Sequence, residues 1–189
     1  MKSPGYFLVV DFEATCCDDD SISLDEREII EFGAVLIEAK SLSTVSEFAS
    51  FVRPIIHAKL SNFCKELTGI RQAEVDKADV FESVLQKFID WQSEYLGALF
   101  SSWGAFDFVQ LNLECVRRNI DRPFFEHLNL KQEFASRNHL SKPCGMRAAL
   151  QLANLPLLGF HHRGIDDARN IARLLPFIVG RETLPLSTS

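Results

Sequence analysis

The chain has 189 residues, of which 47% are hydrophobic and 24% charged, as expected for one globular domain with a sizeable core. A net charge of −6 argues against a protein that binds duplex nucleic acid through bulk positive charge, although cations bound in a pocket could still hold one end of a strand. The five cysteines lack CxxC spacing, so neither a disulfide framework nor a zinc site is expected. We expect no signal peptide and no membrane span, which predicts a cytoplasmic protein.

The first predicted element is a buried strand that ends in two acids. Residues 6–10 form a short apolar run, and Asp11, Phe12 and Glu13 follow it directly. Because side chains alternate along a strand, Asp11 and Glu13 point to one side and Phe12 to the other. Two carboxylates at the end of a core strand are unfavourable unless they are paired or hold a cation. The rest of the chain should therefore supply partners for them.

The elements that follow predict a mixed sheet covered by helices. The loop 16–28 carries three consecutive aspartates and is expected to stay in solvent. Apolar runs predict further strands at 29–37, 45–52 and 98–103, and a fifth around 127–131. Helical spacing is found at 60–67, at 80–89, around Val109, Leu113 and Val116, at 145–152 and at 165–178. Strands followed by alternating helices and strands indicate an α/β fold in one domain, residues 1–180, with a frayed tail at 181–189.

Further acids lie where such a sheet gathers a site. Asp107 follows the fourth strand directly, although a carboxylate in a first helical turn is also favoured by the helix dipole alone. In the last helix Asp166 shares a face with Arg169, Asn170 and Arg173 and should look outward. Asp167 lies nearer the apolar stripe, so it is the predicted inward acid.

Two histidines precede that last helix, in a loop that Gly164 is expected to keep mobile. Composition gives His161 and His162 the same claim to a role. Four acids and a histidine form a hard-oxygen site that suits Mg²⁺ or Mn²⁺, and two such ions could clamp a phosphate for in-line displacement. The histidine would then act as general base toward the attacking water.

Three segments of the sequence resemble the motifs of DEDDh 3′–5′ exonucleases, and most closely those of the Eri-type exoribonuclease branch. They are residues 11–16 (DFEATC), 103–107 (WGAFD) and 162–168 (HRGIDDA), and a further family segment is found at 67–70 (LTGI). The motifs occur in the family order across about residues 6–178. The resemblance implies an RNase H-like fold, a five-stranded mixed β-sheet flanked by α-helices.

The resemblance also implies residue roles. Asp11, Glu13, Asp107 and Asp167 would be the metal ligands for two ions of Mg²⁺ or Mn²⁺, and His162 rather than His161 would be the general base. A sister subfamily has tyrosine at the position of His162. Phe12, Ala14 and Thr15 would line the pocket for the terminal nucleotide, while Phe63 and Leu67 would wedge against its base. Trp103 and Met146 are either further wall residues or core.

The predicted function is therefore metal-dependent 3′–5′ exonuclease activity on the single-stranded or frayed 3′ end of RNA, with release of nucleoside 5′-monophosphates. Two alternatives remain at this point. One is an exonuclease that acts on single-stranded DNA, because DNA exonucleases share these motifs. The other is a non-catalytic nucleic-acid-binding module on the same fold. The retained set of four acids and a histidine argues against the second, since a binding protein needs no general base.

Overall fold

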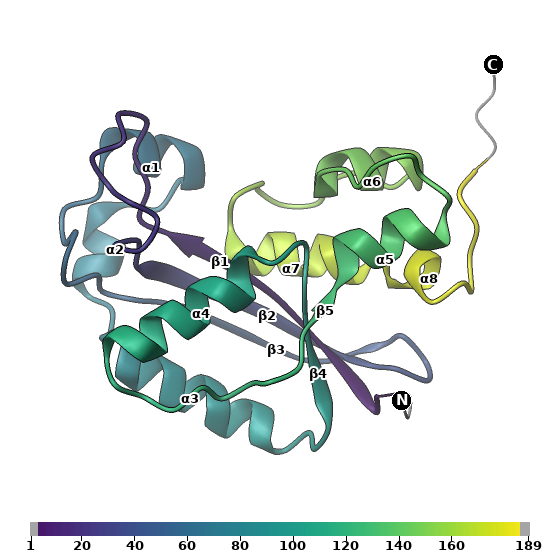
Figure 1. Ribbon diagram of the computed structural model, residues 1–189, viewed down its shortest axis with the longest axis horizontal. Coiled ribbons are helices and arrows are strands. Elements are labelled where there is room, and N and C mark those ends of the chain that lie inside the picture. Colours follow the sequence, from purple (N-terminus) through teal and green to yellow (C-terminus); the bar gives the residue numbers. More distant parts are fainter. Residues whose placement is uncertain (1–3, 186–189) are drawn as a thin grey trace.

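Within residues 4–185, which the computed structural model describes, five strands form one mixed sheet in the order β3-β2-β1-β4-β5 (Figure 1). Strands β1, β2 and β3 are antiparallel neighbours, whereas β4 and β5 run parallel to β1. Their bounds are Tyr6–Ala14 (β1), Ile29–Glu38 (β2), Thr44–Phe51 (β3), Ala98–Ser102 (β4) and Leu128–Asn129 (β5). The predicted five-stranded mixed sheet is confirmed.

Helices cover both faces of this sheet. One face carries α3 (Phe81–Ser93) and α4 (Phe106–Arg117). The other face carries α5 (Leu130–Arg137), α6 (Met146–Leu152), α7 (Gly164–Ala172) and α8 (Leu175–Ile178). The short helices α1 (Asn62–Thr68) and α2 (Gln72–Asp76) lie near the end of β1 (Figure 1). No helix in this part of the chain is long and apolar enough to cross a membrane.

The alternation of side chains along β1 decides which layer its acids face. Phe7 and Val9 pack into the core beneath α7, whereas Val10 and Phe12 pack into the core beneath α3 and α4. Asp11 therefore continues the row that faces α7, as does Glu13 two residues later. This confirms the predicted orientation of the two acids and of Phe12.

The predicted helix from Ile165 to Ile178 is two helices, so that prediction was wrong in its extent. Arg173 and Leu174 keep right-handed helical dihedrals but form a turn between the end of α7 at Ala172 and the start of α8 at Leu175. Pro176, in the first turn of α8, has no N–H to donate to the carbonyl of Ala172, so the first helix cannot continue through it. The fifth strand is also shorter than predicted, because α5 begins at Leu130.

Helix α4 turns a different face to the core from the one that Val109, Leu113 and Val116 predict. Val109 and Val116 are 49% and 70% exposed. The buried face instead includes Gln110, whose Nε2 donates to the carbonyl of Arg27 at 2.7 Å, and Glu114, which accepts from the Ile29 amide at 2.7 Å. Leu111 and Cys115 lie on the same buried face, so this helix is held by apolar packing together with hydrogen-bonded polar groups.

The tail predicted to fray from residue 181 is attached where it begins. The Arg181 guanidinium donates to the carbonyls of Ala39 and Lys40, at 3.0 and 2.6 Å. Leu184 packs against the core beneath α7. The last part of the predicted tail, residues 186–189, lies outside the described residues.

Candidate active site

Two glycines let the start of α7 lie directly on the sheet. A Cβ atom built on Gly33, in β2, would overlap the backbone of Gly164. A Cβ on Gly164 would lie 2.7 Å from the carbonyl oxygen of Asp11. Any other residue at either position would push α7 away from β1. The expectation that Gly164 makes the loop mobile was wrong: it is the buried first residue of α7, and its role is close approach.

This approach brings three acids together. Asp11, Glu13 and Asp167 each offer a carboxylate oxygen, and the three oxygens lie within 4.8 Å of one another. Asp167 is 3% exposed and Glu13 is 8% exposed, while Asp11 is partly accessible. The prediction that Asp167 is the inward acid is confirmed. Asp166 faces outward and pairs with Arg169 at 3.1 Å, also as predicted.

The cluster is strongly unfavourable as a set of bare anions. Burial, and then the charges of Asp167 and Glu31, raise the pKa of Glu13 to about 9. Burial, followed by the nearby charge of Asp107, raises the pKa of Asp11 well above its usual value. Asp167 Oδ1 is buried and accepts no hydrogen bond. Carboxylates this crowded, with an unpartnered oxygen among them, fit a divalent cation that takes oxygen ligands.

Asp107 lies beside this group, at the start of α4. Its Oδ1 accepts a hydrogen bond of 2.8 Å from the backbone amide of Phe12. Burial raises the pKa of Asp107 to about 6, although the hydrogen bond from Phe12 opposes that rise. The Asp107 carboxylate does not join the close trio. Among the neighbouring carboxylates, Asp107 contributes most to the raised pKa of Asp11.

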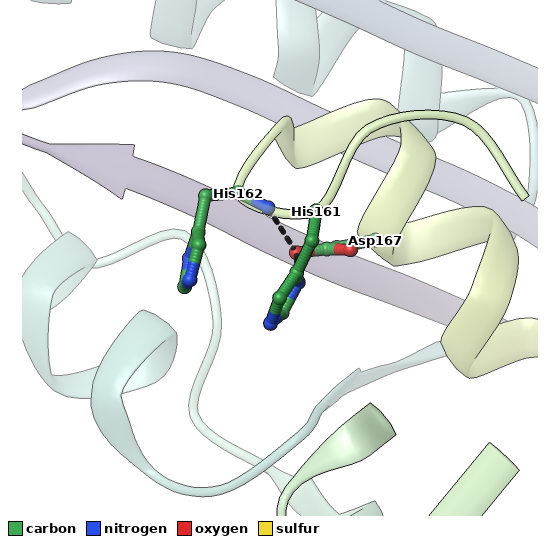
Figure 2. Close-up of side chains that lie close together, drawn as sticks. All are labelled: His161, His162 and Asp167. Atoms are coloured by element: carbon green, nitrogen blue, oxygen red, sulfur yellow. Dashed lines mark hydrogen bonds and ion pairs between the residues drawn. The ribbon is translucent and has the colours of Figure 1, made fainter. Parts of the chain in front are cut away.

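The two histidines meet the acids through Asp167, as Figure 2 shows. Asp167 Oδ2 accepts from His161 Nδ1 at 2.8 Å and from the backbone amide of His162 at 2.9 Å. The two imidazole rings stack with centroids 3.9 Å apart. Burial, and then the neighbouring His161, lower the pKa of His162. His162 is therefore neutral near pH 7, which is the form that accepts a proton.

Two side chains of α7 form hydrogen bonds with the backbone of the loop that precedes this helix. The Asn170 side chain accepts from the amide of Leu158 at 3.1 Å and donates to its carbonyl at 2.8 Å. Asp166 Oδ2 accepts from the Phe160 amide at 2.9 Å. Asn170 is fully buried, so its predicted place on the outward face was wrong. It lies on the buried side because it satisfies the backbone of the loop that carries the histidines.

Sequence analysis missed an ion pair that fixes the junction between this loop and α7. Glu31, opposite Glu13 in the antiparallel register, accepts from Arg163 Nη2 and from the Gly164 amide, both at 3.0 Å. Glu31 is 2% exposed. A buried glutamate inside the apolar run 29–37 was the signal that could have revealed it, because a charged group in a core strand requires a partner.

The residues predicted to contact substrate differ in what they can offer. The Phe12 ring packs on Phe32, centroids 4.5 Å apart, so only its backbone faces the acids. Ala14 and Thr15 are buried, and Thr15 Oγ1 accepts from the Glu28 amide at 2.9 Å. On α1, by contrast, Leu67 is 37% exposed and Phe63 is partly exposed. Both residues belong to α1, which lies near the end of β1 (Figure 1).

Of the two residues left undecided between wall and core, Met146 is buried and Trp103 is partly buried. Trp103 lies against Phe134 and donates from Nε1 to the Cys144 carbonyl at 3.1 Å. Met146 is 6% exposed in the core beneath α7. Core packing accounts for Met146, whereas Trp103 packs against the core and keeps some exposed surface.

The mixed five-stranded sheet with helices on both faces is the RNase H-like fold, and it brings acids together around the end of its central strand. The chain belongs to the Exonuclease (RNase_T) family, whose sequence profile matches residues 8–175. The resemblance to DEDDh exonucleases is thereby confirmed.

Curated relatives point the same way. "ERI1 exoribonuclease 2" of Homo sapiens is 34% identical over 89% of this chain and 28% of its own length. "3'-5' exoribonuclease 1" of Rattus norvegicus is 34% identical over 89% of this chain and 51% of its own length. "3'-5' exonuclease Snipper" of Drosophila melanogaster is 33% identical over 93% of this chain and 69% of its own length. The chain thus spans about half, or less, of the first two relatives.

Among solved structures, the nuclease domain of 3'hExo, described as a DEDDh family member bound to rAMP, is 32% identical to this chain. It aligns with a TM-score of 0.85 over 95% of this chain and 94% of that one. A 3'-exonuclease structure described as recognising the 3' end of a histone mRNA stem-loop aligns with a TM-score of 0.87 at 31% identity, over 96% and 84% of the two chains.

Proposed function

We propose that this chain is a divalent-metal-dependent 3′–5′ exoribonuclease that releases nucleoside 5′-monophosphates from a single-stranded or frayed RNA 3′ end. The observation that carries the proposal is the meeting of carboxylate oxygens from Asp11, Glu13 and Asp167, with His162 beside Asp167, whose Oδ1 is buried without a hydrogen bond. A site for binding alone needs no neutral imidazole next to clustered acids. The names of relatives and solved neighbours support RNA as the substrate.

Each side chain has a distinct task in this proposal. Asp11, Glu13 and Asp167 would hold one ion, and Asp107 would help to hold a second next to Asp11. Two bound Mg²⁺ or Mn²⁺ ions would supply charge stabilisation for the phosphate and a more acidic attacking water. His162 takes the proton of that water, since its lowered pKa keeps it neutral near pH 7.

Substrate recognition in this proposal is independent of sequence. Phe63 and Leu67 present exposed apolar surface on α1, which suits contact with the terminal base. Because the Phe12 ring is in the core, Phe12 could contact a ligand only through its backbone. Such contacts would accept any of the four bases.

The experiment compares 5′-labelled RNA and DNA of the same sequence, each single-stranded or in duplexes with recessed or overhanging 3′ ends. Mn²⁺ is supplied with and without EDTA. We expect a ladder of products shortened from the 3′ end of RNA, release of nucleoside 5′-monophosphates, and loss of both with EDTA. Preferential digestion of DNA would overturn the proposed substrate. Binding without release of mononucleotides would show that the chain is a binding module.

His162→Ala tests the base, and His139→Ala is its matched control. Both histidines have left-handed backbone, with φ of 64° and 54°, so alanine carries the same backbone strain at each position. We expect His162→Ala to lower turnover by about 100-fold or more, with RNA binding retained. The exposed His139 should be replaceable with little effect. Near-normal turnover in His162→Ala would refute the assignment.

A further inference from the structure

His161 contacts two members of the proposed machinery at once, although no role has been given to it so far. Its Nδ1 lies 2.8 Å from Asp167 Oδ2, and its ring stacks on His162 with centroids 3.9 Å apart and planes inclined by 22° (Figure 2). The His161 side chain is 29% exposed. It is therefore placed to influence both a proposed metal ligand and the proposed base.

His161, His162 and Asp167 also offer ligand atoms within 4.8 Å of one another, which raises the question of a separate metal site. The ring geometry argues against one. Each imidazole binds a metal along the lone pair in its own plane, and two nearly parallel planes do not meet at a shared ion. His161 Nδ1 is moreover already engaged by the Asp167 carboxylate. The contacts of His161 are with the protein.

The hydrogen bond to Asp167 fixes which oxygen of that carboxylate remains for a cation. An ionised carboxylate only accepts, so His161 donates from a protonated Nδ1. Together with the His162 amide it occupies Oδ2. Oδ1 is left buried and without a hydrogen bond, in the carboxylate that joins Asp11 and Glu13. Donors that orient a metal ligand in this way typically change metal affinity about 10- to 100-fold when removed.

The stacking contact restrains the other partner. His162 has a φ of 64°, an uncommon backbone conformation for a residue other than glycine, and its side chain has no hydrogen bond among the described contacts of residues 4–185. The flat ring of His161 is thus the neighbour that limits how the His162 imidazole can turn.

We propose that His161 is a positioning residue that fixes the orientations of the Asp167 carboxylate and the His162 imidazole through two separable contacts. The hydrogen bond sets the Asp167 carboxylate for metal binding, and the stacked ring sets His162 for proton transfer. The second half of this inference rests on the proposed exonuclease function. The first half concerns metal affinity alone.

Two substitutions separate these contacts. His161→Asn keeps a nitrogen donor close to the position of Nδ1 but removes the ring. His161→Phe keeps a flat ring but removes the donor. His161→Ala removes both. The measurements are Mn²⁺ affinity by isothermal titration calorimetry, kcat and KM on RNA at saturating Mn²⁺, and the melting temperature of each variant.

We expect Mn²⁺ affinity near that of the unsubstituted protein in His161→Asn, and about 10- to 100-fold weaker in His161→Phe and His161→Ala. At saturating Mn²⁺, kcat should be retained best in His161→Phe and should fall in His161→Asn and His161→Ala, with KM little changed. His161→Asn should thus lose kcat but keep Mn²⁺ affinity, and His161→Phe should do the opposite. This pattern indicates positioning, because a general loss of stability would lower Mn²⁺ affinity and kcat together.

Three results would overturn the proposal. One is unchanged Mn²⁺ affinity and kcat in all three variants. The second is a parallel fall of affinity, kcat and melting temperature in all three, which would make His161 a purely structural residue. The third is a weaker Mn²⁺ affinity in His161→Asn than in His161→Phe. If the unsubstituted chain digests no nucleic acid, the proposed function fails, whereas the calorimetry still decides whether His161 orients Asp167.

Discussion

The backbone amide of Phe12 donates a hydrogen bond of 2.8 Å to Asp107 Oδ1, so the first strand and the helix after the fourth strand are joined at the proposed metal site. Asp107→Asn keeps an oxygen that can accept this bond but removes the negative charge. We expect the fold to be retained and turnover to fall by more than about 100-fold, because an amide is a poor ligand for Mg²⁺. Single-turnover assays and circular dichroism measure the two effects.

Glu133→Gln is the matched control for Asp107→Asn. Glu133 stands in the first turn of α5 as Asp107 does in α4, so it controls for the loss of a favourable charge at a helix N-terminus. Its turnover should stay close to that of the unsubstituted protein. A comparable loss of turnover in both variants would assign Asp107 a helix-dipole role only.

The raised pKa values of the acids predict how stability depends on pH. Burial raises the pKa of Glu13 from 4.5 to about 9 and that of Asp107 from 3.8 to about 6. The folded protein then holds protons that the unfolded chain has released. In the absence of metal, stability from these groups should therefore fall as pH rises from about 4 to about 9.

Divalent cations should oppose this loss of stability at high pH, because a bound cation takes the place of the protons on the clustered carboxylates. We expect the rise in melting temperature caused by Mn²⁺ to be larger at about pH 8 than at about pH 6. Glu13→Gln should flatten the dependence in metal-free protein. Differential scanning fluorimetry in EDTA and in Mn²⁺ measures both. Greater stabilisation by Mn²⁺ at the lower pH would contradict the assignment of these carboxylates as ligands.

The contact between Gly33 and Gly164 predicts that alanine at position 33 destabilises the protein. A Cβ there overlaps the backbone of Gly164, so α7 must move away from β1. We expect a loss of about 1–3 kcal/mol in the free energy of unfolding, together with weaker Mn²⁺ binding. Gly145→Ala is the control, since a Cβ at that position meets no atom within 4 Å. Urea denaturation compares the two, and equal stability would refute the close approach.

The ion pair of Glu31 and Arg163 should matter more than one on the surface. Arg163→Leu leaves a glutamate that is 2% exposed without its charged partner, which typically costs about 3–5 kcal/mol. Arg169→Leu breaks the pairs of Arg169, whose side chain is 48% exposed, with Glu47 and Asp166, which are 36% and 20% exposed. That change should cost about 0–1 kcal/mol. Equal unfolding midpoints in urea for the two variants would show that the buried ion pair of Glu31 and Arg163 contributes no more to stability than the surface pairs.

Local patterns in the sequence were enough to predict much of this fold. The apolar run before Asp11 and the alternation through Glu13 placed both acids on one face of a strand, because those features depend on neighbouring residues alone. The helical period likewise identified Asp167 as inward. The histidine was different: periodicity could not separate His161 from His162, and only the motif resemblance did so.

What sequence analysis missed depends on contacts between distant residues. Gly164 looked like a source of mobility because its partner, Gly33, lies 131 positions earlier in the printed sequence. Asn170 looked like a surface residue because its hydrogen bonds to Leu158 exist only once the loop has folded back. Helix α4 was recognised from Val109, Leu113 and Val116, yet its buried face depends on Gln110 and Glu114 meeting β2 and the loop before it.

The cluster of Asp11, Glu13 and Asp167 draws its members from near the two ends of the sequence. A growing chain on the ribosome has its first two acids early but lacks the third until α7 has been synthesised. Closing so long a stretch of chain is also slow compared with forming local helices. The complete cluster therefore cannot form until synthesis has passed α7, so any chemistry that needs all three carboxylates must wait for that helix.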